Sequence, residues 1–183
     1  VQVAARLQGP FLNPVHEGRL AVDRLTYPPL APLEANLTWK GVGRSPPSVD
    51  LDVVAGESTL TVSGSFGRDQ ARLSALRWRR AATEQLALQA PVLVQWGQPF
   101  RVEPFTLQGA AGSIGGDLDY AAKGGFGFEA RDLSASAFAD FLPALSAQDL
   151  VLKETRLRAA WDDGPMEGTG TLVGRMAVGL DDA

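Results

Sequence analysis

Alternation of apolar and polar residues with a period of two runs through this chain and restricts its fold more than any other feature. In residues 48–67, SVDLDVVAGESTLTVSGSFG, valine, leucine and phenylalanine alternate with aspartate, serine and threonine. A period of two places the apolar side chains on one face of a β-strand and the polar ones on the other. The alternation returns at residues 33–40, 86–96, 126–131, 157–161 and 176–180. We therefore expect an all-β fold with about a dozen strands of roughly 8 to 10 residues.

Turn signals separate these runs: NP at 13–14, YPP at 27–29, SPP at 45–47, GRD at 67–69, KGG at 123–125 and DDG at 162–164. Spacers this short favour antiparallel hairpins over crossover connections. Pro91 lies inside the run 86–96 but on its polar phase, which suits a strand edge or a bulge. One segment, Leu133–Leu145, has apolar residues at helical spacing. It predicts one short helix around residues 134–142, placed to plug or cap the end of a sheet.

The bulk composition limits the classes of partner and site. The chain has 183 residues, a net charge of −4 and no cysteine. Disulfides and thiolate metal sites are therefore excluded, and the acidic balance argues against nucleic acid as a partner. No run approaches the roughly 18 to 20 apolar residues of a membrane-spanning helix. We expect a single domain over residues 1–183, an excised segment of a longer repeat protein, because one hairpin pattern returns at Leu107–Leu118 after Leu7–Leu20.

No catalytic or metal-binding constellation stands out. His16 is the sole histidine and, with Glu17, lies in NPVHEG, which we interpret as an exposed turn rather than a metal site. The glycines between 109 and 127 precede renewed alternation instead of a helix, so we interpret them as turn and bulge glycines rather than a phosphate loop. We therefore predict that the chain is not an enzyme and needs no cofactor or metal.

Three charged or aromatic features have two interpretations each. The basic cluster RWRR, 77–80, could contact anionic lipid head groups or an acidic partner, or could be a solvated strand whose charges discourage edge pairing. The pairs Asp50/Asp52 and Asp117/Asp119 could bind Ca²⁺, but outward solubilising charge explains them as well. Tryptophans could stack sugars, yet Trp39, Trp96 and Trp161 share the apolar phase of their runs, which points them inward.

Several segments resemble the periplasmic repeat region of TamB-like proteins in the wider AsmA-like group. They are the pattern LxG…NP…xGxLxVxxL in 7–25, LEANLTWKGV at 33–42, FTLQGAAGSIGGDLDY at 105–120 and FEARDLSASAFADFLPAL at 128–145. The resemblance implies a long sheet curled into an open half-pipe, or β-taco, with an apolar inner groove. It also implies a bridge anchored in the inner membrane of a diderm bacterium, which crosses the periplasm to an outer-membrane barrel partner. Members of this family are linked to phospholipid transport and to the translocation and assembly of outer-membrane proteins.

On this basis we expect an apolar groove that shields a phospholipid, another acyl-chain guest or a hydrophobic β-strand client. The barrel partner would bind through other parts of the full-length protein, since GLDDA at 179–183 does not match the family's binding region. The cut edges of an isolated segment could also pair as a homo-dimer. The expected groove residues are Leu37, Trp39, Val49, Leu51, Val53, Leu60, Val62, Leu86, Leu88, Val92, Val94, Trp96, Phe126, Phe128, Leu157 and Trp161.

Other folds fit the alternation less well or make different predictions. A closed β-sandwich, used as a structural or carbohydrate-binding module, would seal the same apolar residues in a dry core. A β-helix polysaccharide lyase needs coils of constant length, whereas the spacing here drifts. A membrane-spanning barrel needs an evenly apolar outer band with aromatic girdles, whereas these runs change phase repeatedly.

Overall fold

The computed structural model describes residues 1–26, 32–138, 140, 149–162 and 165–177. Those residues form one antiparallel sheet of thirteen strands, which confirms the predicted all-β, antiparallel fold. The strands are β1 (Gln2–Gln8), β2 (Val15–Leu25), β3 (Leu33–Val42), β4 (Ser48–Ala55), β5 (Ser58–Phe66), β6 (Gln70–Arg80), β7 (Thr83–Leu88), β8 (Val92–Gln95), β9 (Phe100–Gly109), β10 (Gly112–Tyr120), β11 (Lys123–Ser134), β12 (Asp149–Asp162) and β13 (Glu167–Ala177).

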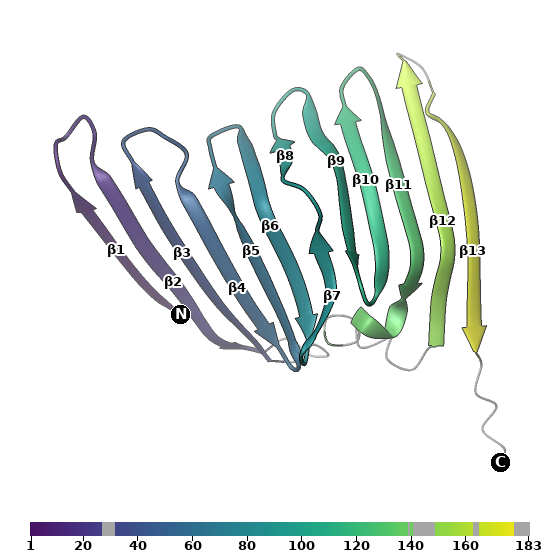
Figure 1. Ribbon diagram of the computed structural model, residues 1–183. Helices are drawn as coiled ribbons and strands as arrows, with labels where there is room; N and C mark the ends of the chain where they lie inside the picture. The colour runs from purple at the N-terminus through teal and green to yellow at the C-terminus, as the bar shows by residue number, and fades with distance from the viewer. Residues whose placement is uncertain (27–31, 139, 141–148, 163–164, 178–183) are drawn as a thin grey trace.

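The strands follow one another across the sheet in nearly the order of the sequence. Consecutive strands pair from β1 to β7, and β9 to β13 continue the series beyond β7. Figure 1 shows them side by side in one twisted layer, with β1 and β13 at opposite edges. Most connections between consecutive strands have two to five residues, and loops this short return the chain to the adjacent position.

This sheet is open, since the described strands neither close into a ring nor pack against a second sheet. Substantial contacts join only strands that are neighbours or next neighbours in the sheet, together with β12 and the short helix. The chain exposes 12277 Å² of surface. A compact monomer of 19.4 kDa would expose roughly 8,500 Å². The described residues therefore do not form the two packed sheets of a sandwich, and the open layer is compatible with the expected half-pipe.

Pro91 interrupts one strand in the middle of the sheet. The run 86–96 was expected to form a single strand, but the structure divides it into β7 and β8, which both lie between β6 and β9. Gln89 still donates its amide hydrogen to the carbonyl oxygen of Thr106 on β9, but Pro91 has no amide hydrogen for the ladder, and regular pairing resumes at Val92. The pairing with both β6 and β9 shifts by one residue across this break, so Pro91 lies at a bulge, as one of the two expected alternatives had it, and not on an edge strand.

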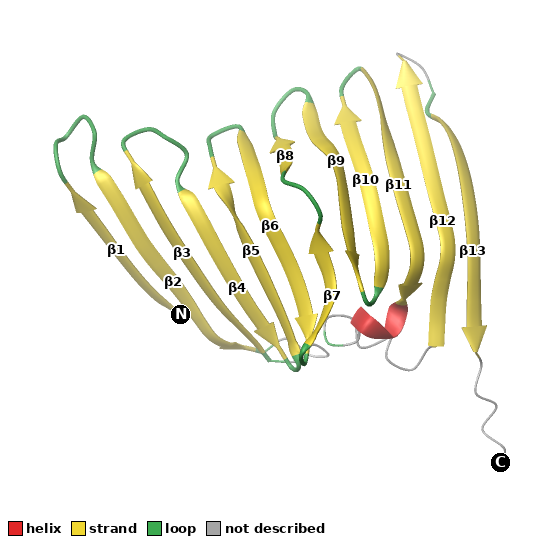
Figure 2. Ribbon diagram, viewed as in Figure 1, coloured by secondary structure: helices red, strands yellow, loops and turns green. Residues whose placement is uncertain are grey.

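A single turn of 3-10 helix, η1 (Ala135–Phe138), follows β11 directly. Figure 2 shows it in red, near the start of β10 and the end of β11. The sequence predicted a helix around residues 134–142. Of that segment, Ser134 belongs to β11, residues 135–138 are helical, and residues 139 and 141–142 lie outside the described residues, as does the predicted stop at Pro143. Ala135 and Ala137 of η1 are buried, so this turn does cover part of the sheet.

Candidate functional site

One face of the sheet is apolar from its first strands to its last. Residues directly opposite each other in an antiparallel ladder project to the same side of a sheet. One row of such partners runs Leu20–Leu37–Leu51–Val62–Leu76 from β2 to β6. A second row runs Val94–Val102–Leu118–Phe126–Ala159 from β8 to β12. We call this side of the sheet the apolar face.

The structure places fifteen of the sixteen expected groove residues in strands, on this face. Trp96 is the exception, because β8 ends at Gln95 and Trp96 begins the following loop. Its indole nitrogen donates a hydrogen bond to the carbonyl oxygen of Arg68 at 2.7 Å. Trp161 likewise donates to the carbonyl oxygen of Ala121 at 2.7 Å. Both rings are therefore hydrogen-bonded to hairpin loops, β5–β6 and β10–β11, which lie at the same ends of the strands.

Most side chains on the apolar face keep part of their surface exposed. Of the sixteen expected residues, only Leu86 and Val92 are buried, and Leu157 is 39% exposed. The buried apolar residues are mostly alanines, and the larger ones among them are Trp78, Leu86, Val92 and Leu133. A sealed core would cover its leucines and aromatic rings almost completely. In the described residues the apolar face is thus an accessible surface.

Glycines on neighbouring strands let two tryptophan rings of the apolar face lie flat on the sheet. A Cβ atom at Gly18 would collide with the ring of Trp39, and one at Gly124 would lie 3.0 Å from the ring of Trp161. Both tryptophan rings therefore lie over a glycine of the adjacent strand, an arrangement also used to pin strand register. Large rings placed in this way cover their own sheet without filling the space above it.

A hollow opens on the apolar face next to Trp161. Its volume is about 520 Å³, and it is lined by Leu118, Tyr120, Ala121, Phe126, Trp161 and Met166. The rings of Tyr120 and Trp161 have centroids 5.8 Å apart, and Tyr120 remains 65% exposed. The lining combines apolar surface with a tyrosine hydroxyl group, which suits an apolar ligand that has a polar end.

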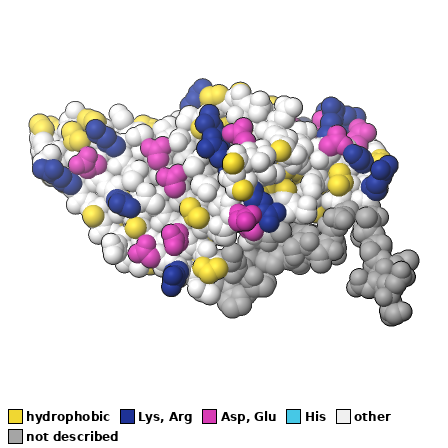
Figure 3. Space-filling model, turned by 60° about the horizontal axis from the view of Figure 1, so that its bottom comes forward, with side chains coloured by type: hydrophobic (Ala, Val, Ile, Leu, Met, Phe, Trp, Pro, Cys, Tyr) yellow, Lys and Arg dark blue, Asp and Glu magenta, His cyan; other side chains and the backbone are white. Residues whose placement is uncertain are grey.

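The opposite face carries a network of paired charges and polar groups. Glu129 forms ion pairs with Arg156 at 3.2 Å and with Arg131 and Arg158 at 3.8 Å. Asp50 accepts a hydrogen bond from Ser63 Oγ at 2.6 Å. Figure 3 shows acidic and basic side chains interspersed with hydrophobic ones over the part of the surface turned to the viewer. These are exposed pairs of small energetic weight, so their main effect is to keep this face in water.

The structure brings the candidate metal ligands into no cluster. Within the described ranges, no three histidine, aspartate or glutamate side chains lie close enough to hold an ion. His16 belongs to β2 and is half-buried, so the exposed-turn interpretation was wrong. Its ring lies over Gly41 of β3, where a Cβ atom would collide with it. The glycines of 109–127 belong to β9, β10 and β11. Gly112 follows the β9–β10 turn and Gly116 adjoins a bulge, as expected, but Gly115, Gly124, Gly125 and Gly127 lie within strands, so the turn-and-bulge interpretation was wrong for them.

The basic cluster at 77–80 divides between the two faces. Arg77 and Arg79 are exposed, whereas Trp78 is 4% exposed and is the centre of the hydrophobic cluster. β6 pairs with strands on both sides, so these arginines do not protect an edge, and that interpretation was wrong. Trp78 packs with Leu86, Ala111 and Ala137, and its ring centroid lies 4.6 Å from that of Phe138. η1 therefore covers the apolar face at this point.

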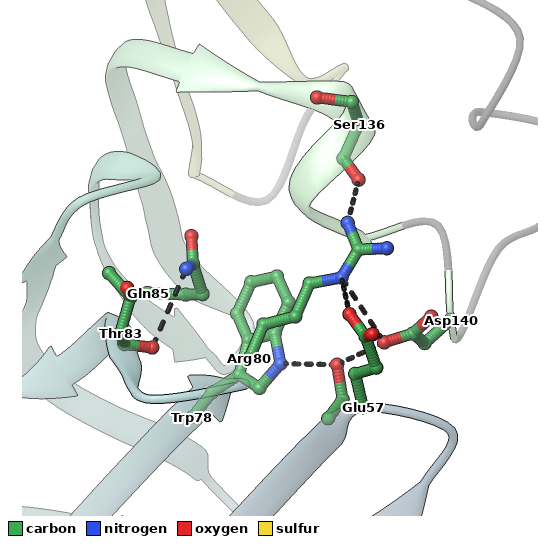
Figure 4. Close-up of polar contacts among 8 residues, drawn as sticks. Glu57, Trp78, Arg80, Thr83, Gln85, Ser136 and Asp140 are labelled. Atoms are coloured by element: carbon green, nitrogen blue, oxygen red, sulfur yellow. Dashed lines mark hydrogen bonds and ion pairs between the residues drawn. The ribbon is translucent and has the colours of Figure 1, made fainter.

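A polar cluster holds η1 beside the hydrophobic cluster around Trp78 (Figure 4). Ser58 Oγ donates to Asp140 Oδ2 at 2.7 Å and accepts from Trp78 Nε1 at 3.2 Å. Arg80 Nε lies 3.4 Å from the same Asp140 oxygen and 3.9 Å from Glu57 Oε2. Arg80 also donates through one terminal nitrogen to the carbonyl oxygen of Ser136 at 3.2 Å. Sequence reasoning missed this cluster, and the one available signal was that Trp78 and Arg80 share the phase of Leu76.

Comparisons with known proteins identify no relative. No family model matches the chain, and neither curated proteins nor solved structures contain a significant match to it. In the described part of the chain, no helix has the length and apolar character needed to span a bilayer. A functional conclusion therefore depends on the geometry of the sheet and on the resemblance of the sequence.

Proposed function

We propose that this chain is a non-enzymatic segment of an inter-membrane bridge, whose apolar face shields the acyl chains of phospholipids. The observation that carries the proposal is a single open layer of thirteen strands with an apolar face that stays partly exposed. The function needs no catalysis: the apolar side chains replace water around the acyl chain, so the lipid is never exposed to water as it moves. Hydrophobic β-strands in transit to the outer membrane are the alternative guests.

The energetics of the apolar face favour an occupant. A large apolar side chain contributes about 1.5 to 3 kcal/mol when it is fully buried. The half-exposed residues of the face realise only part of that free energy in the isolated chain. Partly exposed apolar surface along one face of a sheet is typical of an interaction site. An acyl chain would remove it from water with no requirement for directional bonds.

The cellular setting that we propose follows from the TamB-like resemblance. The segment would lie in the periplasm of a diderm bacterium, in a parent protein anchored in the inner membrane. Other parts of that parent would reach the outer-membrane barrel partner. The edge strands β1 and β13 pair on one side only, so the sheet can continue into neighbouring repeats or pair with a second copy of an isolated segment.

Substitution of one residue of the apolar face by aspartate is expected to remove bound lipid. We expect parent protein purified from a bacterial host to carry phospholipid that native mass spectrometry detects. Phe128→Asp or Leu88→Asp should lower the bound fraction about tenfold or more, because the change removes apolar contact and adds a charge to the path of the guest. The β-sheet signal in circular dichroism should survive, since both side chains are only half-buried.

Thr106→Asp is the matched control for these variants. Thr106 lies on β9 next to Phe105 and Leu107, but it is exposed and projects to the opposite face. The control adds the same charge within the same part of the sheet, so lipid loading should equal that of the parent. Equal loading in Phe128→Asp, Leu88→Asp and the parent would refute the proposed function.

A further inference from the structure

We propose that Ser58 and Arg80 form a binding site for the phosphodiester group of a phospholipid, and that Asp140 occupies this site in the present structure. The inference rests on the proposed function, since it assigns a head-group site to the same apolar face. It also makes the η1 region a built-in competitor, because the Ser136 carbonyl group and the Asp140 carboxylate lie where the lipid would bind.

A hydroxyl donor and a guanidinium group of this site meet at one anionic oxygen. Asp140 Oδ2 accepts a hydrogen bond from Ser58 Oγ at 2.7 Å and forms an ion pair with Arg80 Nε at 3.4 Å, while this buried Nε makes no hydrogen bond among the described residues. Ser58 is completely buried, and its oxygen already accepts from Trp78 Nε1, so the hydroxyl hydrogen is left to bind the anion. The Asp140 side chain is 16% exposed. Hydrogen bonds to an ionised acceptor are the strong ones, and a phosphate oxygen offers the same charge to the same donors.

An apolar patch adjoins these donors directly. Phe138 contacts Trp78 at a centroid distance of 4.6 Å, and Ala137 packs in the same cluster with Leu86 and Ala111. Arg80 also donates to the carbonyl oxygen of Ser136 at 3.2 Å. The bound segment thus offers an anionic oxygen, a carbonyl oxygen and apolar groups within five residues. A diacyl phospholipid combines the same three groups in its phosphate, ester carbonyl and acyl chain.

Glu57 indicates which phosphate the site would accept. Its carboxylate lies 3.9 Å from Arg80 Nε and is 72% exposed. Once Asp140 has left, Arg80 and Glu57 together carry no net charge. A phosphodiester brings a single negative charge, as the Asp140 carboxylate does, whereas a phosphomonoester would bring a second charge next to Glu57. We therefore expect a phosphodiester lipid to bind better than a phosphomonoester lipid with the same chains.

Competition between η1 and the lipid makes the proposal testable with Asp140→Asn. That variant leaves the sheet intact but removes the charge that holds the segment at Ser58 and Arg80. A site that is free in only a tenth of the molecules binds about tenfold more weakly than a site that is always free. Titration calorimetry with dihexanoyl phosphatidylglycerol below its micelle concentration should therefore show tighter binding to Asp140→Asn, by a factor of several up to about ten.

Arg80→Gln should remove the preference of the site for a lipid with a charged head group. The parent should prefer dihexanoyl phosphatidylglycerol to dihexanoyl glycerol about tenfold, Arg80→Gln should lose that preference, and Arg80→Lys should recover part of it. Glycerol phosphate, which has no acyl chains, is the arm that separates a free phosphate from a lipid head group, and it should bind poorly. Hydrogen exchange of the amides at 135–138 should become faster with lipid, because the lipid displaces η1.

Each outcome separates the two proposals. The head-group site is wrong if lipids bind but three results are negative: the parent shows no preference for the charged lipid, Asp140→Asn binds no more tightly than the parent, and lipid leaves amide exchange at 135–138 unchanged. The proposed lipid binding by the apolar face would then stand. If no lipid binds to the parent or to Asp140→Asn, both proposals fail. Glycerol phosphate binding as tightly as the lipid would assign the site to a free phosphate and overturn the lipid head group. Should Arg80→Gln fail to fold, the Asp140→Asn and exchange measurements decide alone.

Discussion

Trp78→Ala should lower the free energy of unfolding by about 3 to 5 kcal/mol, the range for truncating a buried aromatic ring. Trp78 is 4% exposed and packs against Leu86 and Phe138 at the point where η1 meets the sheet. The truncation would leave a cavity under η1 and deprive Ser58 Oγ of its indole donor. Urea denaturation followed by circular dichroism would measure the change, which is a large share of the stability of a domain this size.

Two other variants separate the contributions at this position. Trp78→Phe keeps a ring in the cluster but removes the indole donor to Ser58, so it should cost about 1 to 2 kcal/mol. Trp96→Ala truncates an equally large ring that is 36% exposed and should cost clearly less than Trp78→Ala. Equal losses of unfolding free energy in Trp78→Ala and Trp96→Ala would show that η1 does not bury the Trp78 ring.

Gly112→Ala should lower the free energy of unfolding by about 2 to 4 kcal/mol, because strain and collision act together. Gly112 has a φ of 115°, a conformation that residues with a side chain rarely adopt. An added Cβ atom would also lie 2.5 Å from the carbonyl oxygens of Arg131 and Asp132 on β11. These are backbone atoms of the adjacent strand, so the hairpin or the β10–β11 register would have to shift.

Gly97→Ala is the matched control for this collision. Gly97 also has a positive φ, of 139°, but no atom lies within 4 Å of an added Cβ. The control should therefore show the conformational strain alone, at about 1 kcal/mol or slightly more. Thermal and urea unfolding of the two variants would isolate the steric part as their difference. A loss at Gly97 as large as that at Gly112 would contradict the close packing of β10 on β11.

The alternation of residues was sufficient to predict the strands but not the openness of the sheet. Leu51 opposite Leu37 and Val62 requires only that one face be apolar. A sandwich and an open half-pipe place the same demand on each strand, since they differ in what lies across from the apolar face. That difference is decided by contacts between distant segments, which a period of two does not encode.

Trp78 was missed because a bulge changes the phase of its strand. The register of β6 against β5 shifts between Leu73 and Ala75, so Leu73 and Leu76 both project to the apolar face although three positions separate them. A strict period of two then assigns one half of β6 to the wrong side. The arginines that flank Trp78 completed the impression of a solvated charged strand.

The polar cluster at η1 could not be predicted, because its partners are far apart in the sequence. Ser58 and Asp140 are 82 positions apart and meet only after β5 to β11 have assembled. Nothing local marks Ser58 as a buried donor, since serine at the start of a strand is ordinarily solvated. The helical spacing of 133–145 did predict a covering element, although only one turn of it, η1, is helical among the described residues.

Photochemical cross-linking to lipid tests the central claim most directly, because it reports which side of the sheet a guest contacts. A photoreactive phenylalanine analogue would replace Val62 or Phe128 on the apolar face, and the adjacent Thr61 or Glu129 on the opposite face. After irradiation in the bacterial host, mass spectrometry should find phospholipid adducts at positions 62 and 128 and none at 61 and 129. Equal adducts on both faces, or none on either, would contradict an apolar face that takes a lipid guest.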